Sequence, residues 1–192
     1  MKLKKIIEIA SPLLQEEINY ATNAFQRCQE SSKGAPDEDL PVLVSYLHVI
    51  EIIDGIENLI RNSCSGPIIP LLRSAFEALI TIDYILEADY SRRAFAWLVC
   101  YIYERLSQYE LFDPSSPKSK EFSTNLASDE VSDYFKPAPS LDPSKAIINL
   151  KSLLNTQNYK VANCEYQSPK TKRKRKPQWY SLFGGPSNLR DL

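Results

Sequence analysis

The segment from Gly66 to Leu111 constrains the fold more than any other part of the chain, because it carries two helical patterns in succession. It begins GPIIPLLRSAFEALITIDYILEADYSRRAFAWLVCYIYERL. Residues 68–86 repeat apolar side chains three and four positions apart, which is typical of an amphipathic helix with a wide apolar face. Residues 91–111 form the second pattern, and its centre, residues 94–103, contains no charged side chain. A helix that is apolar all round is normally buried on every side or covered by a partner chain.

Helical spacing also recurs on both sides of this block. Residues 3–30 and 40–63 carry long amphipathic patterns, and residues 121–135 and 144–156 carry shorter, weaker ones. The 13 prolines fall mostly between these segments, as expected of helices joined by stiff loops. No stretch alternates as a strand would. The sequence therefore predicts an all-α fold, a helical bundle of four long helices with short helices and a long irregular C-terminal segment.

We expect the bundle to occupy residues 1–157, with residues 158–192 forming a basic loop and a C-terminal segment that packs on the bundle or trails from it. Within this part, residues 159–185 are predicted to be mostly irregular. The contacts between the helices are expected to run through Ile52, Ile56, Leu72, Phe76, Leu79, Trp97 and Tyr101.

Several classes of protein do not fit this chain. The apolar run near the N-terminus is broken by Glu8 and Pro12, so it is too short for a signal peptide, and no stretch is long and apolar enough to span a membrane. The chain has one histidine, His48, and its four cysteines stand far apart, so we expect neither a metal site nor a cofactor. A reducing cytoplasm is the expected location.

The C-terminus reads GGPSNLRDL, in which Ser187 resembles the N-cap of a helix that stops after one turn. An isolated helical turn is unstable, because nucleation costs more than one turn returns. We therefore expect the end to fray or, as we prefer, the chain to be a truncated form of a longer protein.

Three strings together resemble a known family: PLLRSAFEALITIDYILE, RRAFAWLVCYIYERL and PQWYSLFGGPSNLRDL. They are similar to an uncharacterised bacterial family, domain of unknown function 5677, over residues 40–112 and 177–192. The resemblance implies a helical protein, but it does not imply any particular activity. Members continue into a further helical region with Tyr, Ser and His positions, and some relatives look like components of mobile or defence-linked gene sets.

Arg73 and Glu77 stand one helical turn apart and are the most suggestive charged pair, with Asp83 on the same predicted helix. In a cleft, the arginine would hold a phosphate or carboxylate and the glutamate would act as a base. The alternative is an ordinary ion pair within the helix, which is the commoner use of such spacing. A helical ribonuclease of the toxin type would carry an R-x-x-x-x-H motif, but Leu43 stands five residues before His48.

Four aromatic residues form a second candidate site, either a stacking surface for a base or ligand or part of a core or dimer interface. They are Trp97, Tyr101, Trp179 and Tyr180.

A basic run immediately precedes the last two aromatic residues of this set. Six of the seven residues from Lys170 to Lys176 are basic, and without them the formal net charge changes from -1 to -7. The run is suited to phosphate contacts with a nucleic acid, or it is a solvated loop beside an acidic body. The candidate phosphate contacts are Lys170, Lys172, Arg173, Lys174, Arg175 and Lys176.

Three functions fit these features. The first is a non-enzymatic interaction domain that self-associates through the apolar helix at residues 91–111. The second is a nucleic-acid-binding or nuclease-like component of a bacterial defence or mobile-element system. The third is a small-molecule sensor with an aromatic-lined pocket near Trp97.

Salt dependence tests the nucleic-acid hypothesis. If the basic run contacts phosphates, binding of RNA or DNA should fall by orders of magnitude between about 50 and 200 mM salt, because each contact releases counterions. Neutralising Lys170–Lys176 should remove the binding in an electrophoretic shift assay. Absence of binding by the unmodified protein at low salt would exclude the hypothesis.

Overall fold

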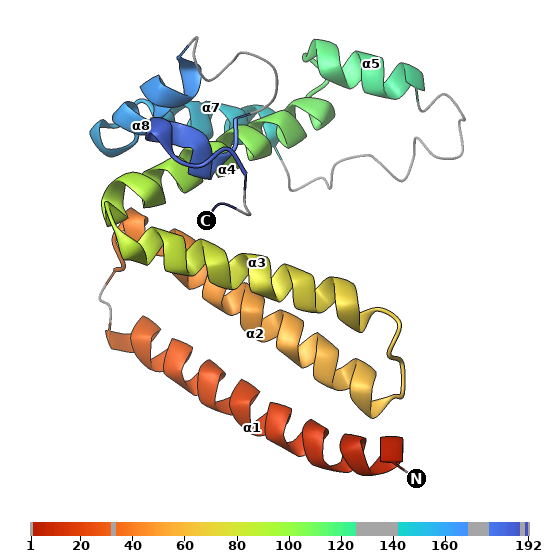
Figure 1. The fold of residues 1–192 in the computed structure, drawn as a ribbon. Helices are drawn as coiled ribbons and strands as arrows, with labels where there is room; N and C mark the ends of the chain where they lie inside the picture. Colours follow the sequence, from red (N-terminus) through yellow and green to blue (C-terminus); the bar gives the residue numbers. More distant parts are fainter. Residues whose placement is uncertain (1, 32–33, 126–141, 169–176, 189–190, 192) are drawn as a thin grey trace. The chain divides into compact units, whose positions relative to one another are not determined.

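The computed structural model describes residues 2–31, 34–125, 142–168, 177–188 and 191. These residues form helices joined by loops, and no strand occurs among them, so the all-α prediction is confirmed (Figure 1). The chain divides into two compact units, residues 1–94 and residues 95–191, with the boundary inside one helix. Each unit is described by itself.

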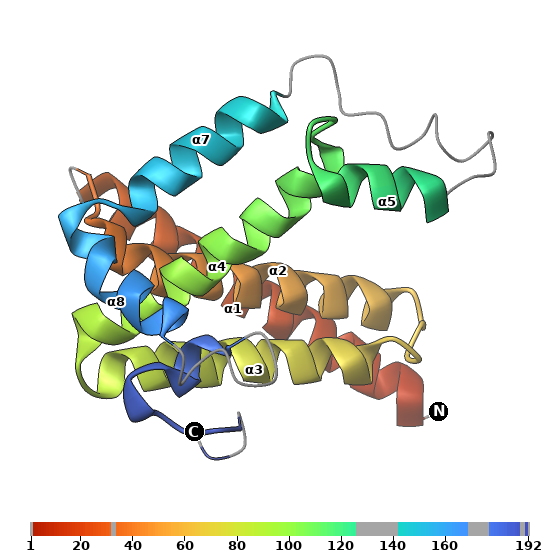
Figure 2. The same ribbon diagram turned by 90° about the horizontal axis from the view of Figure 1, so that it is seen from above.

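The first unit contains α1 (Lys2–Ser31), the short 3-10 helix η1 (Asp37–Asp39), α2 (Leu40–Arg61) and α3 (Ile68–Glu87). α2 packs against both α1 and α3, and Figures 1 and 2 show α2 and α3 running side by side. The core between α2 and α3 contains Ile52, Ile56 and Ala75. The long helices predicted at residues 3–30, 40–63 and 68–86 are therefore present within a few residues of their expected bounds.

A sharp turn precedes α3, and another follows it. After α2, Ser63 adopts a left-handed conformation with φ of 59°, and the Cys64 amide donates to the Leu59 carbonyl at 2.8 Å. This is the hydrogen-bond pattern that satisfies the last carbonyls of a helix. After α3, Asp89 has φ of 48° and precedes α4 (Tyr90–Phe112). The Tyr90 hydroxyl donates to Asp39 Oδ1 at 2.5 Å, which connects the start of α4 to η1.

α1 contains Pro12 in its interior. Proline has no amide hydrogen, so the carbonyl of Glu8, four residues earlier, lacks its usual helical donor. α1 nevertheless remains one continuous helix over the described residues 2–31.

The second unit is built around α4. With it are α5 (Pro117–Asn125), α7 (Pro143–Leu154), α8 (Gln157–Gln167) and the 3-10 helix η3 (Trp179–Gly184). The uncharged centre of α4 contributes Leu98, Val99 and Ile102 to a buried cluster. α7 and α8 complete the cluster with Ile147, Leu154, Tyr159 and Ala162. The apolar surface of α4 at these positions is thus covered by helices of the same chain.

The segment predicted to be mostly irregular, residues 159–185, includes most of α8 and all of η3. That part of the prediction was wrong because α8 has few apolar residues. It is polar overall, but Tyr159 and Ala162 point into the core one turn apart, and this burial stabilises a helix that its composition does not predict.

The predicted helix–helix contacts divide into two groups. Ile52 and Ile56 are buried, as expected. Leu72, Phe76 and Leu79 are exposed, so the prediction that they lie in contacts between helices was wrong. The reason is that α3 carries two apolar stripes side by side, and the face towards α2 is formed by Ile68, Leu71 and Ala75 instead.

Two other expected features fall partly outside the described residues. The short helix expected at residues 121–135 corresponds to α5, which begins earlier, at Pro117; residues 126–135 are not described. At the C-terminus Ser187 lies in a bend, and residues 189–190 and 192 are not described. Among the helices described, none is both long enough and apolar enough to cross a membrane.

Two tyrosines join α4 to α8 in the second unit. The rings of Tyr103 and Tyr166 are nearly parallel, with centroids 4.1 Å apart. The Tyr103 hydroxyl donates to Asn163 Oδ1 at 2.8 Å and accepts from Gln167 Nε2 at 2.6 Å. Burial raises the pKa of Tyr166 from 10.0 to about 12, with smaller contributions from Cys100, Tyr103 and Glu104.

The raised pKa of Tyr166 predicts that the protein loses stability at alkaline pH. Between pH 10 and about pH 12 the unfolded chain releases the Tyr166 proton while the folded chain keeps it, so the free energy of unfolding decreases as the pH rises. In Tyr166→Phe this contribution should be absent, and the decrease should be shallower. Urea denaturation at a series of pH values measures it. Equal slopes for the two proteins would contradict the assignment.

Candidate functional site

The predicted charged site on α3 is a surface feature. Arg73 Nε donates to Glu77 Oε1 at 2.9 Å, and the two side chains are 82% and 42% exposed. Exposed pairs of this kind contribute about 0.3–0.5 kcal/mol to stability. Asp83 follows Glu77 by six residues, so it leaves the helix about 120° further round the axis. It lines a separate surface pocket of about 420 Å³ with Ile80, Tyr84, Leu86 and Glu87.

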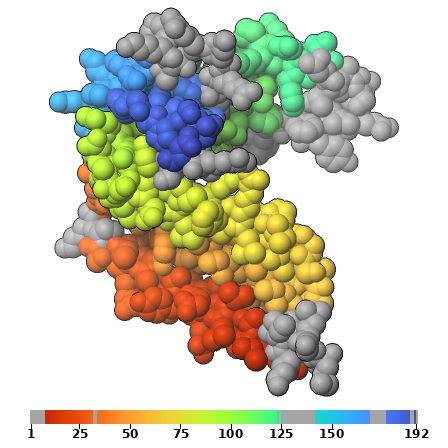
Figure 3. Space-filling view, viewed as in Figure 1, coloured from red at the N-terminus to blue at the C-terminus, as the bar shows by residue number. Residues whose placement is uncertain are grey.

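Beside Arg73 and Glu77, α3 exposes a row of large apolar side chains. They stand at intervals of three, four, three and seven residues, and each is between 48% and 73% exposed. We call this row the α3 stripe; its members are Ile69, Leu72, Phe76, Leu79 and Leu86. In Figure 3 the atoms of α3, yellow to yellow-green, lie at the surface of the first unit. Asp83 occupies the position that would complete the repeat.

The predicted aromatic residues do come together, although they are about 80 residues apart in the sequence. Trp97 and Tyr101 on α4 stack with ring centroids 5.3 Å apart and an interplanar angle of 10°. They line a pocket of about 240 Å³ that also contains Trp179. Tyr180 is not a lining residue; its ring packs edge-on against Trp179 at 5.6 Å.

We call this the aromatic pocket. Its described lining residues are Trp97, Cys100, Tyr101, Glu104, Pro177, Gln178 and Trp179. The wall formed by Pro177–Trp179 approaches α4 closely, since the Cys100 thiol donates a weak hydrogen bond to the Pro177 carbonyl at 3.8 Å. The pocket is therefore assembled by two distant segments of the second unit.

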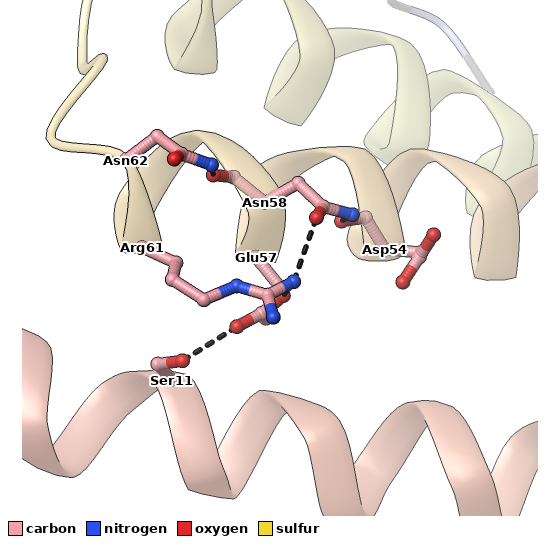
Figure 4. Close-up of polar contacts among 6 residues, drawn as sticks. All are labelled: Ser11, Asp54, Glu57, Asn58, Arg61 and Asn62. Atoms are coloured by element: carbon pink, nitrogen blue, oxygen red, sulfur yellow. Dashed lines mark hydrogen bonds and ion pairs between the residues drawn. The ribbon is translucent and has the colours of Figure 1, made fainter.

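A cluster of polar side chains around Glu57 was not predicted from the sequence. Glu57, on α2, has a side chain with no exposed surface, and it accepts from Ser11 Oγ of α1 at 2.5 Å and from Arg61 at 2.8 Å (Figure 4). Arg61 also donates to Asn58 Oδ1 at 2.7 Å. In the sequence, the four-residue spacing of Glu57 and Arg61 pointed to an ion pair. That spacing does not reveal that the Glu57 carboxylate is buried against α1.

The basic candidates, from Lys170 to Lys176, lie outside the described residues. Within the parts that are described, no group of three or more His, Cys, Asp or Glu side chains is arranged to hold a metal ion.

Comparison with known proteins gives one result. The model described as "Family of unknown function (DUF5677)" matches residues 39–192. The match confirms the resemblance inferred from the three strings and extends it across the intervening residues. No curated protein and no solved structure matched the chain.

The burial of Glu57 predicts a specific cost for removing its donor. Ser11→Ala should lower the free energy of unfolding by about 1–3 kcal/mol, because one oxygen of a buried carboxylate loses a hydrogen bond. Ser31→Ala is the matched control, since that hydroxyl bonds the Cys28 carbonyl at the exposed end of the same helix. Urea denaturation of both variants measures the difference, and equal stabilities would contradict the importance of the Ser11–Glu57 contact.

Proposed function

The chain belongs to the DUF5677 family of unknown function, and from that premise we propose that it is an interaction domain that forms a homodimer through the α3 stripe. The observation that carries the proposal is the regular exposure of five large apolar side chains on one helix. Single exposed apolar residues are ordinary on a protein surface, but a contiguous patch of them is typical of an interaction site. The spacing is that of a coiled-coil seam.

The pattern of the stripe favours pairing with an antiparallel second copy. In that arrangement Ile69 lies opposite Leu86 of the second copy, and Phe76 lies opposite Leu79. Each contact then occurs twice about a two-fold axis, as in most homodimers. An interface of this kind is closed and does not propagate into a filament.

Charge supports the same orientation. Asp83 interrupts the stripe, and in a parallel pair it would face Asp83 of the second copy, which places like charges together. In the antiparallel pair Asp83 lies level with Leu72 and Arg73 of the other helix. The Arg73 side chain is 82% exposed and bordering the stripe, so it is well placed to neutralise this carboxylate.

This location differs from the one expected from the sequence, where the apolar fourth helix was the proposed dimer interface. The buried cluster of α4 already packs against α7 and α8 of its own chain. Among the described residues, α3 instead carries an exposed apolar row, the α3 stripe. The nucleic-acid hypothesis depends on residues 170–176, which are not described, so it stays a prediction from sequence.

Sedimentation velocity tests the dimer. Phe76→Glu should convert a dimer to a monomer, because a carboxylate at the centre of the apolar seam would have to be buried. Val161→Glu, at a similarly exposed apolar position on α8, is the control and should leave the dimer intact. A wild-type protein that is monomeric at all concentrations would overturn the proposal.

A charge exchange tests the orientation. Arg73→Asp and Asp83→Arg should each weaken the dimer, by about tenfold for a change of roughly 1.4 kcal/mol. The double variant should recover most of the loss, because the opposite charges again face each other. If the two losses simply add, the helices are not antiparallel in the proposed register.

A further inference from the structure

The aromatic pocket lies in the second unit and has no part in the proposed dimer, which uses α3 of the first unit. One wall of the pocket comes from α4 and contains Trp97, and the other is the segment Pro177–Trp179. Each wall therefore contributes one indole ring. We propose that this pocket binds one unpaired base of a single-stranded nucleic acid, stacked on the tryptophan rings.

The contacts of Tyr101 make it a support for the pocket. Its ring stacks on Trp97, with centroids 5.3 Å apart and an interplanar angle of 10°. Its hydroxyl accepts from Arg105 Nε at 2.8 Å, and the Arg105 guanidinium carbon lies 5.0 Å from the ring centroid. Because both the ring and the hydroxyl of Tyr101 are engaged within α4, contact with a base falls to Trp97 and, on the opposite wall, Trp179.

The lining and the size of the pocket suit a nucleobase. Every base has a π-face, and stacking on an aromatic side chain raises affinity roughly 5- to 150-fold per base. The exposed Gln178 adds an amide that both donates and accepts hydrogen bonds, as the edge of a base does. The volume of about 240 Å³ is below the roughly 300–1,000 Å³ of sites that enclose a drug-sized molecule. A base therefore fits while its sugar and phosphate stay outside.

Positive charge is attached to both walls, which favours a ligand that carries phosphates. On α4, Arg105 is exposed, and its hydrogen bonds within the described residues go to uncharged groups, the Tyr101 hydroxyl and Gln108 Oε1. On the other wall, Pro177 is joined by a peptide bond to Lys176, the last residue of the basic run. Although the placement of the run is not described, its charge is tied covalently to this wall. Phosphates that flank a bound base would meet that charge.

A single strand fits these features better than a duplex or a free nucleotide. The bases of a duplex are paired and stacked on one another, so a base would have to leave the helix to reach the pocket. A free nucleotide brings the phosphate of one residue only, whereas a strand brings one phosphate for each nucleotide to the six basic side chains of residues 170–176. Glu104 also lines the pocket, but it has an interaction of its own, so recognition does not depend on its charge.

The chain provides its own reporter for a binding experiment, because both of its tryptophans line the pocket. Titration with an oligothymidylate of about eight nucleotides should quench tryptophan fluorescence, with a dissociation constant on the order of 10 μM at about 50 mM salt. At about 200 mM salt the binding should weaken by about tenfold or more, because bound phosphates release counterions. A duplex of the same length should leave the fluorescence unchanged.

Two further ligands separate stacking from charge in the unmodified protein. An abasic strand has the same length and charge as the oligothymidylate but no bases, so it should bind at least about fivefold more weakly. Thymidine monophosphate has the base but lacks the other phosphates, so it should bind at least about tenfold more weakly. Neither comparison depends on whether a variant folds.

Variants of Trp179 test the stacking ring itself, with a fluorescein-labelled oligothymidylate whose anisotropy reports binding. Trp179→Ala should weaken binding roughly 5- to 150-fold at both salt concentrations, because stacking is uncharged. Trp179→Phe keeps an aromatic ring and should bind within about threefold of the unmodified protein. Tyr20→Ala removes an aromatic ring that is 68% exposed on α1; it is the matched control and should change nothing.

The outcomes decide between the alternatives. Equal binding of the abasic strand would mean that only phosphates are recognised, and would overturn the proposal. Equal binding of thymidine monophosphate would identify a site for free nucleotides, and would also overturn it. Absence of quenching by the oligothymidylate at low salt, or unchanged affinity in Trp179→Ala, would have the same consequence. A monomeric protein that still binds the oligothymidylate would overturn the proposed dimer and leave this inference intact.

Discussion

The burial of the apolar centre of α4 is the constraint on which the second unit depends. Because Leu98, Val99 and Ile102 face α7 and α8, the rotation of α4 about its own axis is fixed. Trp97 packs, partly buried, against the edge of this cluster, and η3 brings Trp179 to Trp97 and Tyr101. The position of the aromatic pocket is therefore a consequence of core packing, and its shape depends on residues that do not line it.

The long helices were predictable because their apolar periodicity is strong, and α8 was missed because two buried residues in eleven are too few to make a pattern. The α3 stripe shows a different difficulty. Periodicity indicates that a helix has apolar faces, but it does not indicate which of two adjacent faces contacts its neighbour. For that reason Leu72 and Phe76 were predicted to contact a neighbouring helix, whereas Leu71 and Ala75 make that contact.

The candidate sites show the same limit. Residue type identified Trp97, Tyr101, Trp179 and Tyr180 as suited to stacking, but only the fold places three of them around one pocket. The Ser11–Glu57 contact joins residues 46 positions apart and depends on how α1 packs on α2. Patterns within a single helix do not reveal such a contact between two helices. Arg73 and Glu77, in contrast, form the ion pair that their spacing alone predicts.

The proline inside α1 has a consequence for the dynamics of the first unit. Pro12 interrupts the ladder of amide hydrogen bonds next to Ser11, whose hydroxyl donates to Glu57 of α2. Unwinding of α1 that begins at its N-terminus is therefore less cooperative at Pro12, because one backbone hydrogen bond that would couple the two sides is missing. In amide hydrogen exchange, α1 would then behave as two segments, with the one after Pro12 opening together with the α1–α2 interface.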